Sequence, residues 1–196
     1  MVPMAPIVFF DLMGTVLADP YRRAIEAATR RPLVDVARER DPDAWPAFES
    51  GAIDEAAFAR RFYADGRPFD VATFHRVRRA GYRYLPGMRE LLDELAGRAE
   101  RHLATNYPSW VDELLVRFGL HARLEAVWAS CRLGVRKPDP AFYERMLAGA
   151  SPARCLLVDD RLDNCLAAEA WGLAAHHFVG ADDLRGRLRA EGLLSG

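Results

Sequence analysis

The chain has 196 residues, of which 51% are hydrophobic and 28% are charged, and its formal net charge is −1 at pH 7. This length suits one domain, or one domain with a small insert, and it is sufficient to bury a sizeable core. The nearly balanced charge gives no strong field that would recruit nucleic acid or an acidic membrane, so we expect neither as a partner.

The first predicted element is a strand over residues 7–10, Ile-Val-Phe-Phe, which ends at Asp11. A short, continuous apolar run is typical of a strand buried within a parallel sheet. The run is too short to span a membrane and lacks the basic flank of a signal peptide. The cysteines have no metal-ligand spacing, which indicates reduced thiols in a cytoplasmic protein; they are Cys131, Cys155 and Cys165.

A helical stretch follows the first strand. Asp19 and Pro20 form a good helix start, and no convincing strand occurs before about residue 84. Turn residues separate candidate helices over residues 20–30, 32–40, 43–50, 54–64 and 70–80. An insert directly after the first strand should lie over the C-terminal end of that strand, where it would act as a cap.

From residue 85 onward, helices and strands alternate. The expected helices span 87–97, 109–118, 139–148, 163–171 and 182–191, and the expected strands span 101–105, 125–129, 154–158 and 174–178. This alternation indicates an α/β fold with a parallel sheet that is covered on both faces. We therefore predict an α/β core of residues 1–16 and 85–196, interrupted by an all-helical cap of residues 17–84.

Polar residues gather where the predicted core strands end. Because the ends of parallel strands lie along one edge of the sheet, these side chains should meet. Three carboxylates placed close together need a compensating cation, and Mg²⁺ suits oxygen ligands and also neutralises a bound phosphate. The residues concerned are Asp11, Thr105, Asn106, Asp159 and Asp160.

Lys137 belongs to the same edge, since it precedes the helix predicted near residue 139. It is the only lysine among 27 basic residues. A compact ammonium group is not interchangeable with a guanidinium group where a point charge must fit a tight site. We expect Lys137 to hold the Asp11 carboxylate and an incoming phosphate, with Thr105 donating a hydrogen bond to a phosphoryl oxygen. Asp11 would then attack in line as a nucleophile.

Four motifs in this order resemble those of the haloacid dehalogenase superfamily of aspartate-nucleophile hydrolases. They are Phe10-Asp11-Leu12-Met13-Gly14-Thr15, Leu103-Ala104-Thr105-Asn106, Arg136-Lys137-Pro138-Asp139-Pro140, and Leu157-Val158-Asp159-Asp160 followed by Asn164. The resemblance implies a Rossmann-like core with a small helical cap, Mg²⁺ as cofactor and a covalent aspartyl intermediate.

The resemblance also implies roles for individual residues. Asp11 would be both nucleophile and metal ligand, and Thr105 and Lys137 would bind the transferring group. Asp160, Asp159 and the backbone carbonyl of Met13 would complete the metal site. For substrate binding we add three further candidates on their position alone, namely Asn106, Arg22 and Arg23.

Met13 departs from the family's phosphatases, in which a second Asp usually stands two residues after the nucleophile. That Asp protonates the leaving oxygen and later activates water, and such help is worth about 10²–10⁴-fold in rate. Methionine can do neither. The sequence therefore favours a phosphatase for small phosphorylated metabolites with good leaving groups, working as a monomer or homodimer on an anionic substrate.

Two other functions remain open and one is nearly excluded. A 2-haloacid dehalogenase also lacks the second Asp, but Asp159 and Asp160 would crowd its nucleophile without a metal. A protein that binds a phosphorylated ligand without turning it over would also fit. A phosphonatase needs a lysine in the cap, and residues 17–84 contain none.

Overall fold

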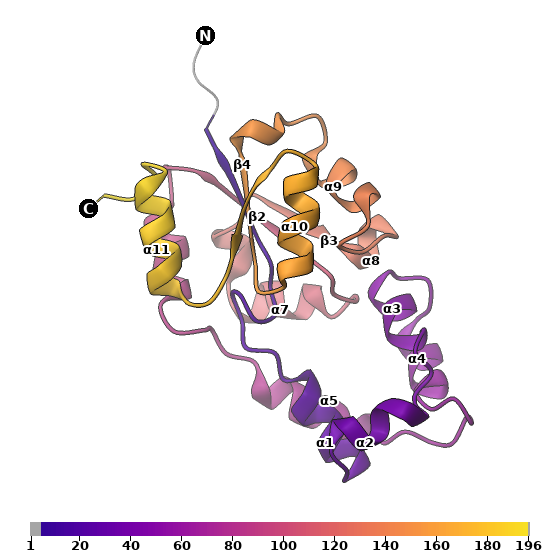
Figure 1. Ribbon diagram of the computed structural model, residues 1–196. Helices are drawn as coiled ribbons and strands as arrows, with labels where there is room; N and C mark the ends of the chain where they lie inside the picture. The colour runs from indigo at the N-terminus through magenta and orange to yellow at the C-terminus, as the bar shows by residue number, and fades with distance from the viewer. Residues whose placement is uncertain (1–4, 196) are drawn as a thin grey trace.

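The computed structural model describes residues 5–195 and is built around one five-stranded sheet in the order β3-β2-β1-β4-β5 (Figure 1). Every pair of neighbouring strands runs parallel. The strands are β1 (Ile7–Phe10), β2 (Glu100–Thr105), β3 (Ala126–Ala129), β4 (Cys155–Asp159) and β5 (Ala174–His177). The predicted α/β class with a parallel sheet is confirmed.

Strand β1 lies at the centre of the sheet, and its four residues are buried. Alternate side chains point to opposite faces of a strand. Val8 and Phe10 accordingly join one hydrophobic core, while Ile7 and Phe9 join a second core on the other face. The apolar run that predicted this strand is therefore continuous because both of its faces are covered.

Helices cover both faces of the sheet (Figure 1). Buried residues of three helices belong to the first core: α6 (Met88–Glu94), α7 (Val111–Arg117) and α11 (Ala181–Ala190). Two others contribute to the second core: α9 (Pro140–Leu147) and α10 (Leu162–Ala170). The remaining elements after β2 are short: α8 (Ser130–Leu133), η2 (Leu120–Ala122) and η3 (Pro152–Arg154).

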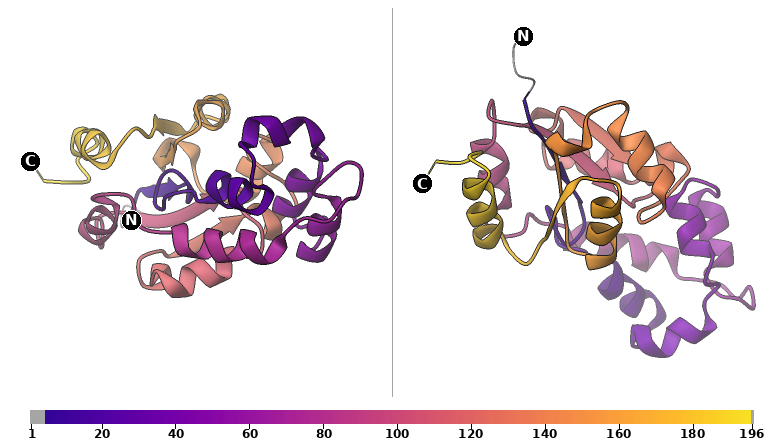
Figure 2. Two further views of the ribbon diagram at one scale, coloured as in Figure 1. Left: turned by 90° about the horizontal axis from the view of Figure 1, so that it is seen from below. Right: turned by 45° about the horizontal axis from the view of Figure 1, so that its top comes forward.

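The segment between β1 and α6 forms a helical lobe beside one end of the sheet (Figures 1 and 2). Its elements are α1 (Tyr21–Thr29), α2 (Leu33–Val36), η1 (Ala37–Glu39), α3 (Ala44–Glu49), α4 (Glu55–Arg61) and α5 (Val71–Gly81). The two chain segments that enter and leave this lobe pair with each other. Leu17 forms an antiparallel bridge with Tyr84, and the Ala18 amide donates to the Arg83 carbonyl at 2.9 Å. We refer to this lobe as the cap.

Aromatic packing joins the cap to the core. Phe48 of α3 and Phe58 of α4 stack with ring centroids 5.1 Å apart, and Trp110 of the core lies edge-on to Phe48 at 4.9 Å. Trp110 also donates a hydrogen bond from Nε1 to Glu55 Oε2 at 2.6 Å. The cap therefore shares a hydrophobic core with the first face of the sheet and does not form an independent cluster.

The helix starts expected from the sequence are present. Asp139 Oδ1 accepts from the Ala141 amide at 2.8 Å at the start of α9, and Asp19 Oδ1 accepts from the Tyr21 amide at 2.9 Å at the start of α1. None of the helices within residues 5–195 is both long and apolar enough to cross a membrane. The three cysteines are free, as expected.

Candidate functional site

Asp11 lies at the C-terminal end of β1 and is only 7% exposed. Its amide donates to the Val158 carbonyl of β4 at 2.8 Å, so the backbone at Asp11 is still held by the sheet. A carboxylate at this point is positioned by rigid backbone pairing, which favours a reactive group that must keep one orientation.

Lys137 is the centre of a buried hydrogen-bond network at this edge. Its Nζ donates to Asp11 Oδ1 at 2.8 Å, to Asp159 Oδ2 at 2.5 Å and to the Ala104 carbonyl at 2.5 Å. These three bonds use all three protons of the ammonium group within the protein. Burial alone would lower the pKa of Lys137, but Asp11 and Asp159 outweigh it and raise that pKa, so the side chain stays charged.

Asp159 is fully buried and lies on the inner side of this network. Besides Lys137, its carboxylate accepts from Asn164 Nδ2 at 3.0 Å and from the Arg161 amide at 2.9 Å. Asp159 is not among the residues that line the cavity next to Asp11. Its oxygens hold Lys137 and the following loop, and metal ligation by Asp159 stays a prediction.

The Asn106 side chain forms hydrogen bonds with the backbone of Lys137. Its Oδ1 accepts from the Lys137 amide at 2.7 Å and its Nδ2 donates to the Lys137 carbonyl at 2.8 Å. Both ends of the amide are therefore engaged, which makes Asn106 a positioning residue for Lys137 even though it also borders the cavity. Thr105 ends β2 and is 1% exposed, but it does not line the cavity, so its contact with a phosphoryl oxygen stays a prediction.

A cavity of about 350 Å³ opens between the sheet edge and the cap. The core side contributes the groups expected from the motifs, together with neighbouring side chains: Asp11, Met13, Asn106, Tyr107, Arg136, Asp160, Arg161 and Asn164. The cap side contributes Asp19, Tyr21, Trp45 and Glu49. The core side of the cavity is therefore rich in carboxylates, and the cap side is partly aromatic.

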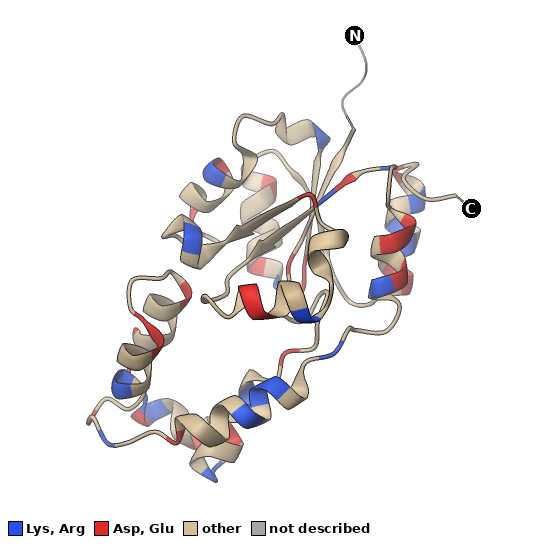
Figure 3. Ribbon diagram, turned by 180° about the vertical axis from the view of Figure 1, so that it is seen from behind, with Lys and Arg blue, Asp and Glu red and all other residues tan. Residues whose placement is uncertain are grey.

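The basic residues at this cavity differ from those expected. Arg22 and Arg23 were candidate substrate contacts, but neither lines the cavity. Arg22 is exposed on α1 and pairs with Glu26, and Arg23 lies by a separate hollow next to Arg76. Substrate contact by either residue therefore stays a prediction. Basic residues gather on the cap helices more generally (Figure 3), and they do so outside this cavity.

Arg136 and Arg161 are the arginines that do line the cavity, and the sequence motifs assign neither a role. Arg136 Nη2 lies 2.5 Å from Glu49 Oε2, across the boundary between core and cap. Arg161 is largely exposed at the rim. The one available signal was their position, since each directly follows or precedes a motif residue.

Two carboxyl groups that face the cavity, those of Asp11 and Asp160, have raised pKa values. Burial raises the pKa of Asp11 to about 7, with Lys137 opposing the shift and Asp159 and Asp160 adding to it. Burial and the charge of Asp159 also raise the pKa of Asp160. Raised pKa values of this kind are typical of a site that is completed by a cation.

The donor set fits Mg²⁺. Asp11 and Asp160 both face the cavity, and Gly14 packs so tightly on Asp160 that a Cβ atom at Gly14 would clash with that carboxylate. The loop around residue 13 is therefore held against Asp160. Within residues 5–195 no group of three or more His, Cys, Asp or Glu side chains forms a metal cluster. Two carboxylates supplemented by backbone oxygen and water suit a hard cation such as Mg²⁺.

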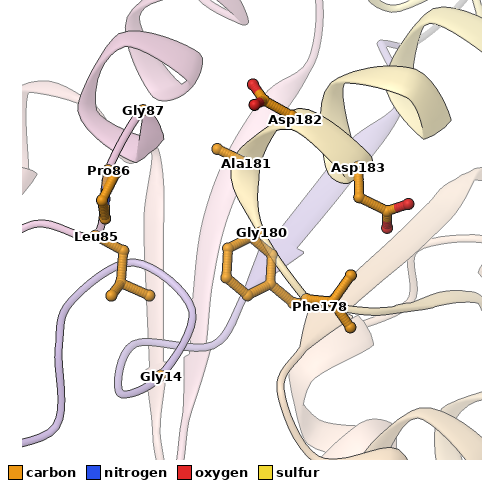
Figure 4. A pocket seen from close by; sticks show the side chains of 10 residues that line it. Gly14, Leu85, Pro86, Gly87, Phe178, Gly180, Ala181, Asp182 and Asp183 are labelled. Carbon is orange, nitrogen blue, oxygen red and sulfur yellow. The ribbon is translucent and has the colours of Figure 1, made fainter.

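A larger hollow, of about 730 Å³, is lined by the same loop at Gly14 (Figure 4). It is lined by Gly14, by Leu85 and Phe178, and by the start of α11. The charged residues among its described lining are Asp182 and Asp183, both acidic. The described lining of this hollow offers a phosphorylated ligand two acidic groups and no cationic side chain, so the smaller cavity is the better candidate site.

Comparison with known proteins supports the same conclusion. The model of the haloacid dehalogenase-like hydrolase family matches residues 6–172. Flavin mononucleotide hydrolase 1 of Arabidopsis thaliana, named as chloroplastic, is 39% identical over 182 residues, covering 91% of this chain and 74% of the relative. The sesquiterpene phosphatase astK of Aspergillus oryzae is 30% identical over 160 residues, covering 77% of this chain and 80% of the relative.

Solved structures share the fold at lower identity. A predicted HAD-like family hydrolase from Porphyromonas gingivalis superposes with a TM-score of 0.78 at 22% identity, covering 96% of this chain and 98% of the other. A HAD family enzyme from Bacteroides thetaiotaomicron, in complex with magnesium and inorganic phosphate, gives a TM-score of 0.72 at 17% identity, covering 88% and 93%. The chain thus belongs to the haloacid dehalogenase-like hydrolases.

Proposed function

We propose that this hydrolase is a Mg²⁺-dependent phosphatase in which Asp11 is the nucleophile. The buried network that joins Asp11, Lys137 and Asp159 carries the proposal. It holds Asp11 Oδ1 in a fixed position and keeps a cation beside it, which leaves Oδ2 to attack a phosphorus atom in the cavity. A purely structural ion pair would not need to face a cavity that contains a further carboxylate, Asp160.

The chain's residues divide the chemistry between them. Asp11 forms a bond to phosphorus while the bond to the leaving oxygen breaks, and water later cleaves the acyl phosphate. Lys137 keeps Asp11 oriented and offsets its charge, while Asp159 and Asn106 hold Lys137 from either side. Asp11, Asp160 and the backbone carbonyl of Met13 would hold Mg²⁺. When bound, Mg²⁺ would neutralise charge on the phosphoryl oxygens and lower the pKa of the nearby carboxyl groups.

We further propose flavin mononucleotide as the first substrate to test. The relative with 39% identity is named for it, and that relative is matched over most of this chain. The cap side of the cavity supplies Tyr21 and Trp45, whose rings suit a flat aromatic or an apolar alcohol group. A terpenyl phosphate is the second candidate, since the other curated relative is named as a sesquiterpene phosphatase. Both candidates are small anionic molecules.

Met13 also leaves room for a dehalogenase, because a halide leaving group needs no proton. Asp160 opposes this alternative, since it brings a second anion into the cavity with Asp11. A binding protein without turnover is the other alternative. The cytoplasmic location and the monomeric or dimeric state also stay predictions.

One panel of assays separates these functions. The purified chain is incubated with flavin mononucleotide, a terpenyl phosphate, p-nitrophenyl phosphate or 2-chloropropionate, each with Mg²⁺ and with a chelator. We expect phosphate release that requires Mg²⁺ and is lost in Asp11→Asn. Halide release that survives chelation would contradict the proposal in favour of a dehalogenase. Binding of phosphate esters without release of phosphate from any of them would favour a binding protein.

A further inference from the structure

Glu49 is a buried carboxylic acid that the cap places in the cavity with the proposed nucleophile. It ends α3, is 6% exposed and lines the same cavity as Asp11. Two contacts fix this end of α3 on the core. The Ser130 hydroxyl of α8 donates to the Glu49 carbonyl at 2.5 Å, and Gly51 packs directly on the Cys131 backbone. Glu49 is therefore anchored to the rigid part of the molecule although it belongs to the cap.

The proposed reaction needs a proton donor that the first motif does not supply. Flavin mononucleotide and terpenyl phosphates are esters of primary alcohols, whose alkoxides leave poorly unless they are protonated. Met13 has no proton to give. In an in-line displacement the leaving oxygen lies opposite the attacking Asp11. Because Asp11 stands at the sheet edge, the leaving oxygen points toward the cap side of the cavity.

The cap side offers three titratable side chains, and two of them are poorly suited to donate a proton to the leaving oxygen. Arg40 donates to the Tyr21 hydroxyl at 2.6 Å, and burial raises the pKa of Tyr21 far above neutrality, so it would be a weak acid. Asp19 is exposed, and although partial burial raises its pKa, its Oδ1 accepts from the Tyr21 amide, which favours the ionised form. Glu49 is the remaining carboxyl group on that side.

We propose that Glu49 is the general acid and base of this site, replacing the function that is absent at Met13. In the first step, the bond between phosphorus and the leaving oxygen breaks, and the proton of the Glu49 carboxyl group moves to that oxygen. In the second step, the Glu49 carboxylate takes a proton from the water that attacks the phosphorus and releases Asp11. Glu49 thus returns to its protonated form, and no other reactant is required.

The surroundings of Glu49 suit both steps. Burial raises its pKa to about 7, against the opposing charge of Arg136, so both forms are available near neutral pH. Arg136 lies beside the carboxylate that remains after proton transfer, and it can stabilise that charge. The other polar groups that act on Glu49 are Trp45 on its own helix, Asp19 and Tyr21.

The test compares two substrates that differ in their need for a proton. Wild type and Glu49→Gln are assayed with saturating Mg²⁺ on p-nitrophenyl phosphate, which has a good leaving group, and on flavin mononucleotide. In single turnovers, Glu49→Gln should slow the phosphorylation of Asp11 by flavin mononucleotide about 10²–10³-fold and by p-nitrophenyl phosphate less than about tenfold; the later hydrolysis step is common to both substrates and is left out of this comparison. Asp19→Asn is the matched control, and it should affect both substrates to the same extent.

A pH profile and a rescue variant separate chemistry from structure. In the wild type, the rate of Asp11 phosphorylation by flavin mononucleotide should fall as the pH rises through about 7, because Glu49 loses its proton, and Glu49→Gln should lack this decline. Adding Met13→Asp to Glu49→Gln should restore turnover of the alkyl ester, since it returns an acid to the first motif. The role of Glu49 would be overturned if Glu49→Gln left Asp11 phosphorylation unchanged with both substrates, or slowed it equally with both. The inference rests on the proposed function, which fails separately if Asp11→Asn retains wild-type phosphate release.

Discussion

The edge of the sheet and the cap contribute to the cavity in different ways. At the sheet edge, charged groups are held by short hydrogen bonds to one another and to the backbone, as in the bonds from Lys137 to Asp11, Asp159 and Ala104. The cap presents aromatic rings and a single buried carboxyl group, Glu49. The contrast indicates that the core determines the reaction, whereas the cap determines which alcohol group is accepted and how it leaves.

Removing the nucleophile from the sheet edge should have the largest effect. We expect Asp11→Asn to lower kcat by at least about 10³-fold with every phosphate ester, because it removes the proposed nucleophile. Phosphate release at saturating substrate measures this. Asp163→Asn, which changes an exposed carboxylate of α10, is the control and should keep wild-type rates.

Replacing the lysine should damage the fold as well as turnover. Lys137→Met leaves Asp11 and Asp159 buried without their cation, which should cost about 3–5 kcal/mol in the free energy of unfolding. Urea denaturation measures this cost, with Arg89→Met on the exposed side of α6 as control. A stability equal to that of the control would show that the buried network is not what holds this edge together.

Removing an aromatic ring of the cap should alter substrate preference while the attack by Asp11 is kept. Trp45→Ala should raise KM for flavin mononucleotide about three- to tenfold, which corresponds to the loss of about 0.5–1.5 kcal/mol of aromatic contact. The kcat for p-nitrophenyl phosphate should change little. Trp171→Ala, at the end of α10 outside the cavity, is the matched control. If kcat fell equally for both substrates, the proposed division between core and cap would be wrong.

The smallest effect concerns stability and pH in the absence of Mg²⁺. The folded-state pKa of Asp11, about 7, lies above its ordinary value of 3.8. The stability linked to protonated Asp11 is therefore complete below pH 3.8 and is lost as the pH rises toward and through 7. Asp11→Asn removes this loss, so its Tm should exceed that of the wild type at pH 8 by more than at pH 5. We expect a difference on the order of 1 kcal/mol, or about 2–4 °C.

Much of the core was predictable because its strands carry a local signal. All five strands were placed within one residue at each end, since a buried parallel strand is a continuous apolar run that ends at a turn or a polar group. The position of Asp11, and that of Lys137 as the sole lysine, followed from the same logic. Helix α8 was missed because four residues are too few to show a helical period.

The composition of the site was less predictable because it depends on packing between distant segments. The sequence cannot tell which of Asp159 and Asp160 faces the cavity, since that depends on how β4 ends. Its one signal for Arg136 and Arg161 was their position next to Lys137 and Asp160, and this did not show that they line the cavity while Arg22 and Arg23 do not. The one local signal for Glu49 was a carboxylate at the C-terminal end of a helix, where the helix dipole disfavours negative charge.

The most direct measurement is the detection of phosphate bound to Asp11. The Mg²⁺-loaded enzyme is mixed with flavin mononucleotide, quenched in acid within one turnover and digested, and the peptide that contains Asp11 is analysed by mass spectrometry. We expect a phosphorylated Asp11 that is absent from Asp11→Asn and from samples with chelator. Phosphate release that proceeds without any modification of Asp11, and at the same rate in Asp11→Asn, would contradict it.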